Sequence, residues 1–280
     1  MSEPELLRYT AFTDRPEGGN PAGVVLDARG LDAARMQAIA AAIGYSETAF
    51  LSPRADGGYD TRYYSPEKEI SFCGHATIAA AVALAERSAP GHLRLHTRVG
   101  EVAVETHRTD GRTTATLTSV EPHVVVPSDE LLASALAALR WSPDELDPAL
   151  PARIGFAGAR HLILAARTRE RLRELDYDYA ALKALMLAHD LTTLALLWRE
   201  GPTLFHARNP FPPGGVVEDP ATGAAAAALG AYLRELALVV PPATITIHQG
   251  VDMGRPSLLT VEIGARGGIR VTGQAVPVAP

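Results

Sequence analysis

The sequence has few of the residues and patterns on which several protein classes depend. Its 280 residues include one cysteine, Cys73. A single cysteine excludes an intramolecular disulfide framework and any cysteine-built zinc site. Lysine occurs only at Lys68 and Lys183, so arginine supplies nearly all of the positive charge. The formal net charge is −6, and no basic stripe of the kind that binds nucleic acid stands out.

Long apolar runs and long basic runs are also missing. Six arginines lie between Arg153 and Arg173, but Glu170 interrupts them and Glu174 follows; we interpret this segment as a solvated helix face and loop. No stretch approaches the ~20 apolar residues of a membrane span. Residues 1–5 are acidic and no apolar run follows them, so we expect no secretory signal and a cytoplasmic location.

Several familiar functional motifs are absent as well. No Walker loop is present, and no G-x-G-x-x-G leads from a strand into a helix, which argues against ATP and dinucleotide cofactors. The nine histidines are scattered and form no H-E-x-x-H motif, so we expect no metal site. The segment 44–48 nearly matches a nucleophile elbow but lacks its second glycine, which argues against a serine hydrolase.

The apolar pattern predicts a globular protein with alternating strands and helices. The apolar fraction of 47% and the length fit two domains of ordinary size. A helix with apolar residues at helical spacing should end at Gly44. We predict strands over 6–12, 22–26, 47–51, 59–64, 161–166, 193–198, 204–208, 244–248 and 258–263, further strands between 93 and 117, and helices over 31–43, 76–86, 179–189 and 224–236.

The two halves of the chain repeat this order. Thr77 and Thr222 each follow an alanine at the start of an alanine-rich helix, at an offset of 145 residues, and the same offset maps 48–51 onto 193–196. We therefore predict an α/β (α+β) fold of two pseudo-symmetric lobes. The boundary is expected in the proline-containing stretch 121–128, which gives an N-terminal lobe of residues 1–121 and a C-terminal lobe of residues 128–280. The last C-terminal residues are free to return to the N-terminal lobe.

Glu47 is a candidate for proton transfer. It lies between Ser46 and an apolar strand, where a buried and unpaired carboxylate would be costly. Its side chain therefore either points to solvent or lines a cleft and moves a proton. The turn that contains Asn20, by contrast, is explained by turn chemistry alone.

Two helix starts are candidates for binding an anion. The first is the segment 74–77, which contains His75, and the second is the segment 219–223, where Asp219 is expected at the N-cap and Pro220 in the first turn. A plain N-cap would also account for Asp219, and a helix-start hydrogen bond would account for His75. A helix N-terminus favours a small anion such as a carboxylate, and fixed N–H groups stabilise enolate-like charge.

Five segments in this order resemble the motifs of PhzF-like proteins, relatives of the phenazine-biosynthesis isomerase on the diaminopimelate epimerase fold. The resemblance covers nearly the whole chain. The segments are Gly19-Asn20-Pro21-Ala22-Gly23-Val24, Ser46-Glu47-Thr48-Ala49-Phe50, Phe72-Cys73-Gly74-His75-Ala76-Thr77, Asp219-Pro220-Ala221-Thr222-Gly223 and Gly250-Val251-Asp252-Met253-Gly254-Arg255-Pro256.

The resemblance implies two lobes, each a mixed β-sheet or barrel wrapped around a central helix, with frequent homodimers and no cofactor. It implies that Glu47 is the general acid/base, and that His75 and Asp219 are catalytic residues that hold the substrate and assist proton movement. The substrate is implied to be a small carboxylate-bearing molecule, with neither nucleic acid nor membrane as a partner. The residues implied to bind it are Asn20, Ser46, Cys73, Gly74, Thr77, Thr222, Gly223 and Gly250.

The lone cysteine narrows the range of reactions that we expect. Related epimerases use two thiols, which would map onto Cys73 and Asp219, so a two-thiol racemase is excluded by count. Cys73 also departs from the small residue of the phenazine enzyme, which puts that enzyme's dihydro-hydroxyanthranilate substrate in doubt. The first hypothesis is a cofactor-independent isomerase that shifts a proton through Glu47. The alternatives are a one-base epimerase or hydro-lyase on an amino or hydroxy acid, and a non-catalytic anion-binding protein.

Overall fold

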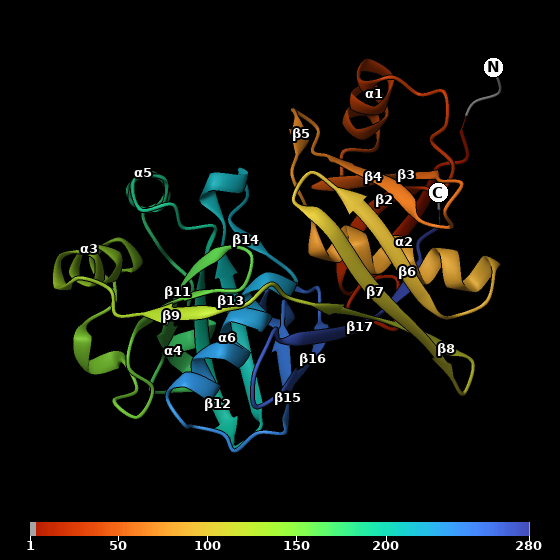
Figure 1. Cartoon of the computed structure of the whole chain (residues 1–280). Coiled ribbons are helices and arrows are strands. Elements are labelled where there is room, and N and C mark those ends of the chain that lie inside the picture. The colour runs from red at the N-terminus through yellow and green to blue at the C-terminus, as the bar shows by residue number, and fades with distance from the viewer. Residues whose placement is uncertain (1–3, 280) are drawn as a thin grey trace. The chain divides into compact units, whose positions relative to one another are not determined.

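The computed structural model describes residues 4–279, in two compact units. The N-terminal unit contains the chain up to Thr118 together with the residues from Thr272 on, and the C-terminal unit contains Ser119–Val271. Both units mix strands with a few helices (Figure 1), which confirms the predicted α/β class. Residues 1–3, on which the expectation of no secretory signal partly rests, lie outside the described range.

The strands of the N-terminal unit close into a barrel. In hydrogen-bonded order they are β1 (Leu7–Ala11), β2 (Asn20–Val25), β3 (Glu47–Pro53), β4 (Tyr59–Tyr64), β6 (His92–Thr97), β7 (Gly100–Thr109), β8 (Arg112–Thr118) and β17 (Arg270–Pro277). The last of these, β17, pairs with both β8 and β1 and so closes the ring. The pairs β2–β3 and β4–β6 are parallel. The short strand β5 (Glu69–Ile70) pairs with β4.

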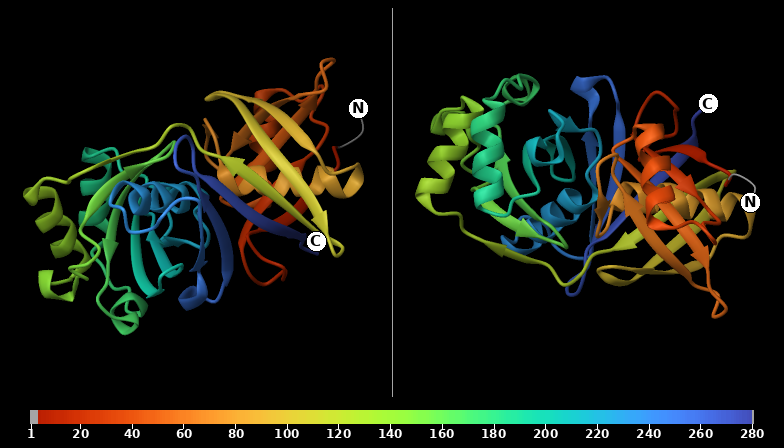
Figure 2. Two further views of the ribbon diagram at one scale, coloured as in Figure 1. Left: turned by 60° about the horizontal axis from the view of Figure 1, so that its bottom comes forward. Right: turned by 90° about the horizontal axis from the view of Figure 1, so that it is seen from above.

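Helix α2 (Gly74–Arg87) is the core of this unit (Figure 2). Every residue from His75 to Ala85 is buried, and the helix contacts β1, β2, β3, β7 and β8. A helix that is apolar all round is buried all round, and its many alanines let the strands approach closely. Helix α1 (Ala33–Ile43) buries only Met36 and Ala40 and ends at Gly44 with a φ of 70°, as predicted.

The C-terminal unit is built from a second mixed sheet. In hydrogen-bonded order its strands are β9 (His123–Val125), β10 (Arg153–Phe156), β11 (Arg160–Ala165), β12 (Thr193–Gly201), β13 (Leu204–Pro210), β15 (Ala243–Gln249) and β16 (Ser257–Ile263), with β14 (Glu218–Asp219) paired to β13. The alanine-rich helix α6 (Gly223–Glu235) contacts β9, β10, β11 and β16.

The order of pairings in the two units is the same. In each, an antiparallel pair is followed by a parallel pair, an antiparallel pair, a short two-residue strand, an alanine-rich helix and a second parallel pair. This repetition confirms the predicted pseudo-symmetry. The offset of 145 residues is wrong in detail, because α2 begins at Gly74 and α6 begins at Gly223.

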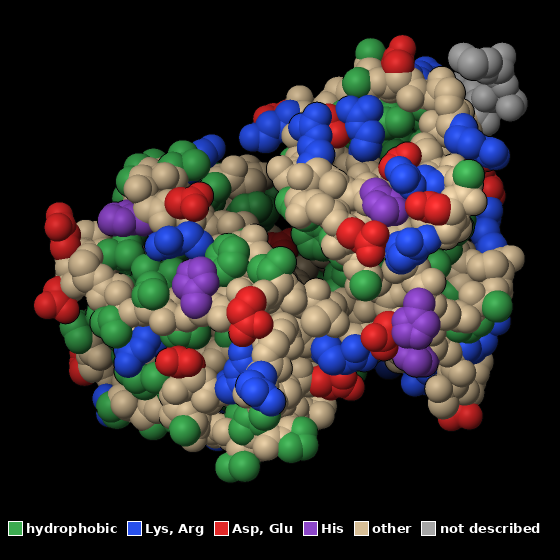
Figure 3. All heavy atoms as spheres, in the orientation of Figure 1, with side chains coloured by type: hydrophobic (Ala, Val, Ile, Leu, Met, Phe, Trp, Pro, Cys, Tyr) green, Lys and Arg blue, Asp and Glu red, His purple; other side chains and the backbone are tan. Residues whose placement is uncertain are grey.

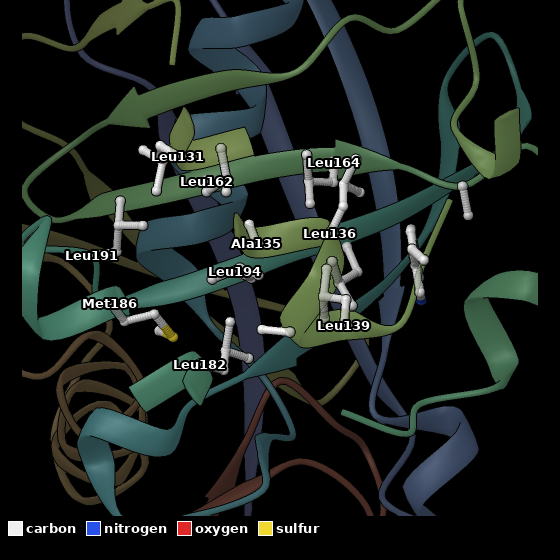
Figure 4. Close-up of a cluster of buried hydrophobic side chains, with 14 of the residues drawn as sticks. Leu131, Ala135, Leu136, Leu139, Leu162, Leu164, Leu182, Met186, Leu191 and Leu194 are labelled. Atoms are coloured by element: carbon white, nitrogen blue, oxygen red, sulfur yellow. The ribbon is translucent and has the colours of Figure 1, made fainter. Parts of the chain in front are cut away.

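A second helical layer packs on the sheet of the C-terminal unit (Figure 4). Helices α3 (Asp129–Leu139) and α5 (Tyr179–Ala188) lie against β11 and β12 through a cluster of buried aliphatic side chains. Helix α3 was not predicted, and β9 lies within the stretch 121–128 that the sequence presents as a boundary. The same unit contains the short helices α4 (Arg169–Arg173), η1 (Pro143–Glu145), η2 (Pro212–Gly214) and η3 (Val251–Met253).

The interpretation of the segment from Arg153 to Arg173 as a solvated helix face and loop holds only in part, because Arg167 and Arg173 are exposed but Arg169 and Arg171 are not. Arg171 pairs with Glu145 and Arg169 with Asp252, and the side chains of the two arginines are only 18% and 23% exposed. Basic and acidic side chains are interspersed on the face that Figure 3 presents. Among the described residues, no helix is both long enough and apolar enough to span a membrane.

Candidate active site

Glu47 and His75 form the central contact of the site in the N-terminal unit. Glu47 is the first residue of β3, and His75 is the second residue of α2. Their side chains are 15% and 8% exposed, and Glu47 Oε2 lies 3.2 Å from His75 Nε2. Ser46 Oγ lies 3.5 Å from the same nitrogen. The carboxylate therefore does not point freely to solvent but meets an imidazole at the edge of the barrel.

The other ring nitrogen of His75 faces Asn20 and Cys73. Asn20 Nδ2 lies 3.1 Å from His75 Nδ1, and Cys73 Sγ lies 3.3 Å from the same atom. Asn20 is placed by Gly19, whose φ is +66° and whose Cβ, if present, would lie 2.3 Å from the Ala11 carbonyl oxygen. If the Asn20 amide donates to Nδ1, the ring proton lies on Nε2, where it can be donated to the Glu47 carboxylate.

The start of α2 leaves backbone donors without side-chain caps. Cys73 is the N-cap residue but makes no side-chain cap hydrogen bond. The first N–H groups of a helix have no acceptor within the helix, and they favour an anion. Gly74 begins the helix, and a Cβ there would meet nothing within 4 Å. This end of α2, next to Glu47 and His75, is suited to bind a carboxylate or to stabilise an oxyanion.

Thr77 supports this segment from behind. It is fully buried, and its hydroxyl donates to the Cys73 carbonyl oxygen at 2.7 Å. The Tyr63 hydroxyl lies 2.6 Å from Thr77 Oγ1 and must be the donor there, because the single hydrogen of Thr77 is already used. Tyr63, which sequence reasoning missed, therefore anchors the Cys73 backbone through Thr77. Nothing in the local sequence around Tyr63 distinguishes it from any other strand tyrosine.

The remaining predicted site residues belong to the C-terminal unit. Asp219 ends β14, and its Oδ2 accepts a hydrogen bond of 2.5 Å from Thr222 Oγ1. The prediction that Asp219 is the N-cap of the next helix is wrong. The N-cap is Thr222, α6 begins at Gly223, and Pro220 precedes the first turn. Thr222 makes no side-chain cap bond because its hydroxyl is turned back onto Asp219.

Gln249, the last residue of β15, joins the N-cap residue Thr222 to the backbone of Asp219. Its Oε1 accepts from Thr222 N at 3.1 Å, and its Nε2 donates to the Asp219 carbonyl oxygen at 2.8 Å and to Thr222 Oγ1 at 3.1 Å. Gly250 follows with a φ of +73°, and a Cβ there would lie 2.7 Å from the Pro220 carbonyl oxygen. Gln249 was missed by sequence reasoning, and the only signal was its position directly before the Gly250 motif.

Comparison with known proteins defines the class of protein to which this fold and these residues belong. YfhB, an uncharacterized isomerase of Bacillus subtilis, is 30% identical, with 99% of this chain and 97% of that protein covered. The trans-2,3-dihydro-3-hydroxyanthranilate isomerase of Pseudomonas chlororaphis is 33% identical, with 89% and 86% covered. The protein is therefore an isomerase.

Solved structures agree with this class. A predicted epimerase from Pseudomonas aeruginosa superimposes with a TM-score of 0.86 at 28% identity, with 99% of this chain and 98% of that chain covered. A hydroxyproline epimerase from Agrobacterium vitis, at 14% identity and a TM-score of 0.67, shares the fold, with 98% and 89% covered. The family model of phenazine biosynthesis-like proteins, PhzC-PhzF, matches residues 9–280. The chain belongs to this family, as its motifs predict.

Proposed function

We propose that the protein is a cofactor-independent isomerase that shifts a proton between carbons of a small carboxylate-bearing substrate, with Glu47 as general acid and base. The contact between Glu47 Oε2 and His75 Nε2 at 3.2 Å carries this proposal. It holds a half-buried carboxylate beside a group that can donate or accept a proton, next to uncapped N–H groups of α2. The relatives named trans-2,3-dihydro-3-hydroxyanthranilate isomerase support the reaction class.

In the proposed reaction, Glu47 removes a proton from a carbon atom adjacent to the part of the substrate that carries the carboxylate. The electron pair left on that carbon delocalises into an enolate-like oxyanion, which the N–H groups at the start of α2 stabilise. The same carboxyl returns a proton to a different carbon, so the step is neutral in oxidation state and requires no electron carrier. His75 holds the Glu47 carboxylate in place through Nε2 and is oriented by Asn20 and Cys73 through Nδ1.

Asp219 is proposed to contribute the substrate-holding group of the C-terminal unit. The hydrogen bonds from Thr222 and Gln249 fix its position. Thr222, Gly223 and Gly250 then act as the frame around this aspartate, and Ser46 and Gly74 belong to the N-terminal site. We propose a homodimer in the cytoplasm, as the resemblance and the acidic composition suggest.

The decisive test replaces Glu47 by glutamine, which keeps the shape of the side chain and removes the base. Wild type and Glu47→Gln are incubated in heavy water with a panel of small unsaturated and hydroxylated carboxylic acids that includes trans-2,3-dihydro-3-hydroxyanthranilate. Proton NMR then follows deuterium entry and double-bond migration. We expect wild-type turnover with at least one acid, and a loss of at least about 10²-fold in Glu47→Gln, in line with general acid–base catalysis.

The matched control is Glu101→Gln, an exposed carboxylate on β7 near His96. It should retain wild-type rates. Equal rates in wild type and Glu47→Gln would contradict the proposed role of Glu47. Deuterium at an α-carbon with inversion and no migration of a double bond would favour the epimerase alternative instead, and binding without any exchange would favour an anion-binding protein.

A further inference from the structure

Three potential metal ligands converge in the N-terminal unit. Glu47, Cys73 and His75 each offer one ligand atom, and these atoms all lie within 4.8 Å of one another. We refer to these three residues as the Glu–Cys–His cluster. Among the residues that the structure describes, no other group of three His, Cys, Asp or Glu side chains has this arrangement. In the proposed isomerase reaction Glu47 moves the proton, and the Cys73 thiol only helps to orient His75 and takes no part in the chemistry.

The chemistry of the three donors is that of a zinc ligand set. A thiolate, an imidazole and a carboxylate bind Zn²⁺ at roughly 2.0–2.3 Å, and three protein ligands with one open position are typical of accessible zinc sites. Ligand atoms on a tetrahedral ion of that size lie roughly 3.3–3.7 Å apart. Here Glu47 Oε2 and His75 Nε2 are 3.2 Å apart, and Cys73 Sγ and His75 Nε2 are 3.8 Å apart.

The surroundings can complete such a site. Cys73 Sγ lies 3.3 Å from Nδ1 and 3.8 Å from Nε2 of His75, so binding of one ion through Nε2 requires a rotation of the thiol. Asn20 Nδ2 lies 3.1 Å from Nδ1, so an ion bound through Nε2 requires the Asn20 amide to flip, after which its oxygen can accept the Nδ1 proton and orient the ring.

The charge of the cluster also favours a bound divalent ion over the same ligands without an ion. Cys73 is 7% exposed and Glu47 is 15% exposed at its side chain, so two negative ligands here would be poorly solvated. A thiolate, a carboxylate and a neutral imidazole sum to −2, which Zn²⁺ neutralises. Hard ions such as Mg²⁺ prefer oxygen ligands and should not compete.

We propose that the Glu–Cys–His cluster binds Zn²⁺, or a divalent ion of similar softness, with Glu47, Cys73 and His75 as ligands and the fourth position open. Binding itself does not depend on the proposed function. The consequence of binding does depend on the proposed function. An ion held by Glu47 and His75 would block proton transfer through Glu47, and zinc would then inhibit the isomerase.

The test measures zinc and the thiol directly. Untagged protein is stripped with a chelator, incubated with Zn²⁺ or Mg²⁺, passed through a desalting column and analysed for metal by mass spectrometry. We expect about one zinc ion and no magnesium per chain. Cys73→Ser should weaken zinc binding by at least about tenfold. His96→Gln removes a histidine near Asp56 and Glu101 but outside the cluster, and should bind zinc like wild type.

A second measurement needs no variant. Because Cys73 is the only cysteine, the rate at which a small methanethiosulfonate modifies the protein reports on one sulfur atom. Equimolar zinc should slow this modification at least fivefold, and magnesium should leave it unchanged. Zinc that is retained equally by wild type and Cys73→Ser, or a thiol whose modification rate zinc does not change, would overturn the site even if turnover through Glu47 is confirmed.

Discussion

At the scale of single residues, His161 is a polar residue whose burial the sequence does not indicate. It is fully buried at the start of β11, and its Nδ1 lies 2.8 Å from Thr193 Oγ1. Asn209 donates to the same hydroxyl at 3.4 Å. Nε2 of His161 is buried without a hydrogen-bond partner. Desolvation of the charged form lowers the pKa of His161 to about 3.

This burial predicts a pH-dependent loss of stability. The pKa of His161 in the folded protein lies below its ordinary value of 6.5, so the unfolded chain binds more protons between those values. The free energy of unfolding should therefore fall as the pH is lowered from about 6.5 toward 3, by up to about 1.4 kcal/mol per pH unit from this residue. Urea unfolding of wild type and His161→Gln across this range measures the difference.

The variant should show a flatter pH dependence than wild type. The exposed His107 provides the control, because His107→Gln should leave the wild-type profile unchanged. Identical profiles for wild type and His161→Gln would mean that His161 becomes protonated without cost in the folded protein, contrary to its burial.

At the scale of elements, the attachment of α6 depends on a side chain from another strand. Gln249 of β15 accepts from Thr222 N and donates to Thr222 Oγ1, and so it fixes the N-cap residue of α6 in place. We expect Gln249→Ala to lower the free energy of unfolding by about 1–3 kcal/mol, because it removes the part-buried hydrogen bonds to Thr222 N, Thr222 Oγ1 and the Asp219 carbonyl oxygen. Urea unfolding followed by circular dichroism measures the loss.

Gln249→Glu is the matched variant for this prediction. It keeps the acceptor for Thr222 N but cannot donate to the Asp219 carbonyl oxygen or to Thr222 Oγ1. It should therefore be less stable than wild type as well, through repulsion of the Asp219 carboxylate. A Gln249→Ala protein as stable as wild type would show that water replaces these hydrogen bonds without penalty.

Elements defined by their own sequence were predictable, and elements defined by a distant partner were not. The alanine-rich apolar runs of α2 and α6 predicted both helices, and Gly44 predicted the end of α1. The strand β17 was missed, because it exists only through pairing with β1 and β8. Helix α3 was missed although Ser128 caps it, because nearby prolines suggested a boundary.

The candidate site, too, could be predicted from the sequence only in part. Motif order identified Glu47, His75 and Cys73, and the structure brings their side chains together. Sequence order alone could not give the 3.2 Å contact of Glu47 with His75, since it arises where the start of β3 meets the start of α2. Tyr63 and Gln249 carry no local signal, because each acts by supporting a residue that is far away in the chain.

At the scale of the whole molecule, the N-terminal unit is assembled from both ends of the chain. Strand β17 closes its barrel, and Thr272 Oγ1 lies 2.7 Å from Thr116 Oγ1 of β8. A chain that stops at Val271 should leave the facing edges of β1 and β8 unpaired. We expect its N-terminal unit to lose most of its protection against hydrogen exchange, while the amides of β10 to β13 keep theirs.

Hydrogen-exchange mass spectrometry resolves the two units in one experiment. Removal of residues 279 and 280 alone keeps all of β17 and should leave the exchange pattern unchanged. Wild-type protection of β1 and β8 in the chain that ends at Val271 would show that the barrel is stable when open, and would contradict the closing role of β17.

The position of β17 also sets an order of events during synthesis. A ribosome makes residues 7–118 of the N-terminal unit before the C-terminal unit, yet β17, which closes the barrel of the N-terminal unit, follows the C-terminal unit in the chain. The C-terminal unit, by contrast, is one continuous segment and is complete before β17 emerges in full. The barrel is therefore completed only after the C-terminal unit has been synthesised. Until then β1 and β8 have unpaired edges, which are the kind of surface that chaperones protect.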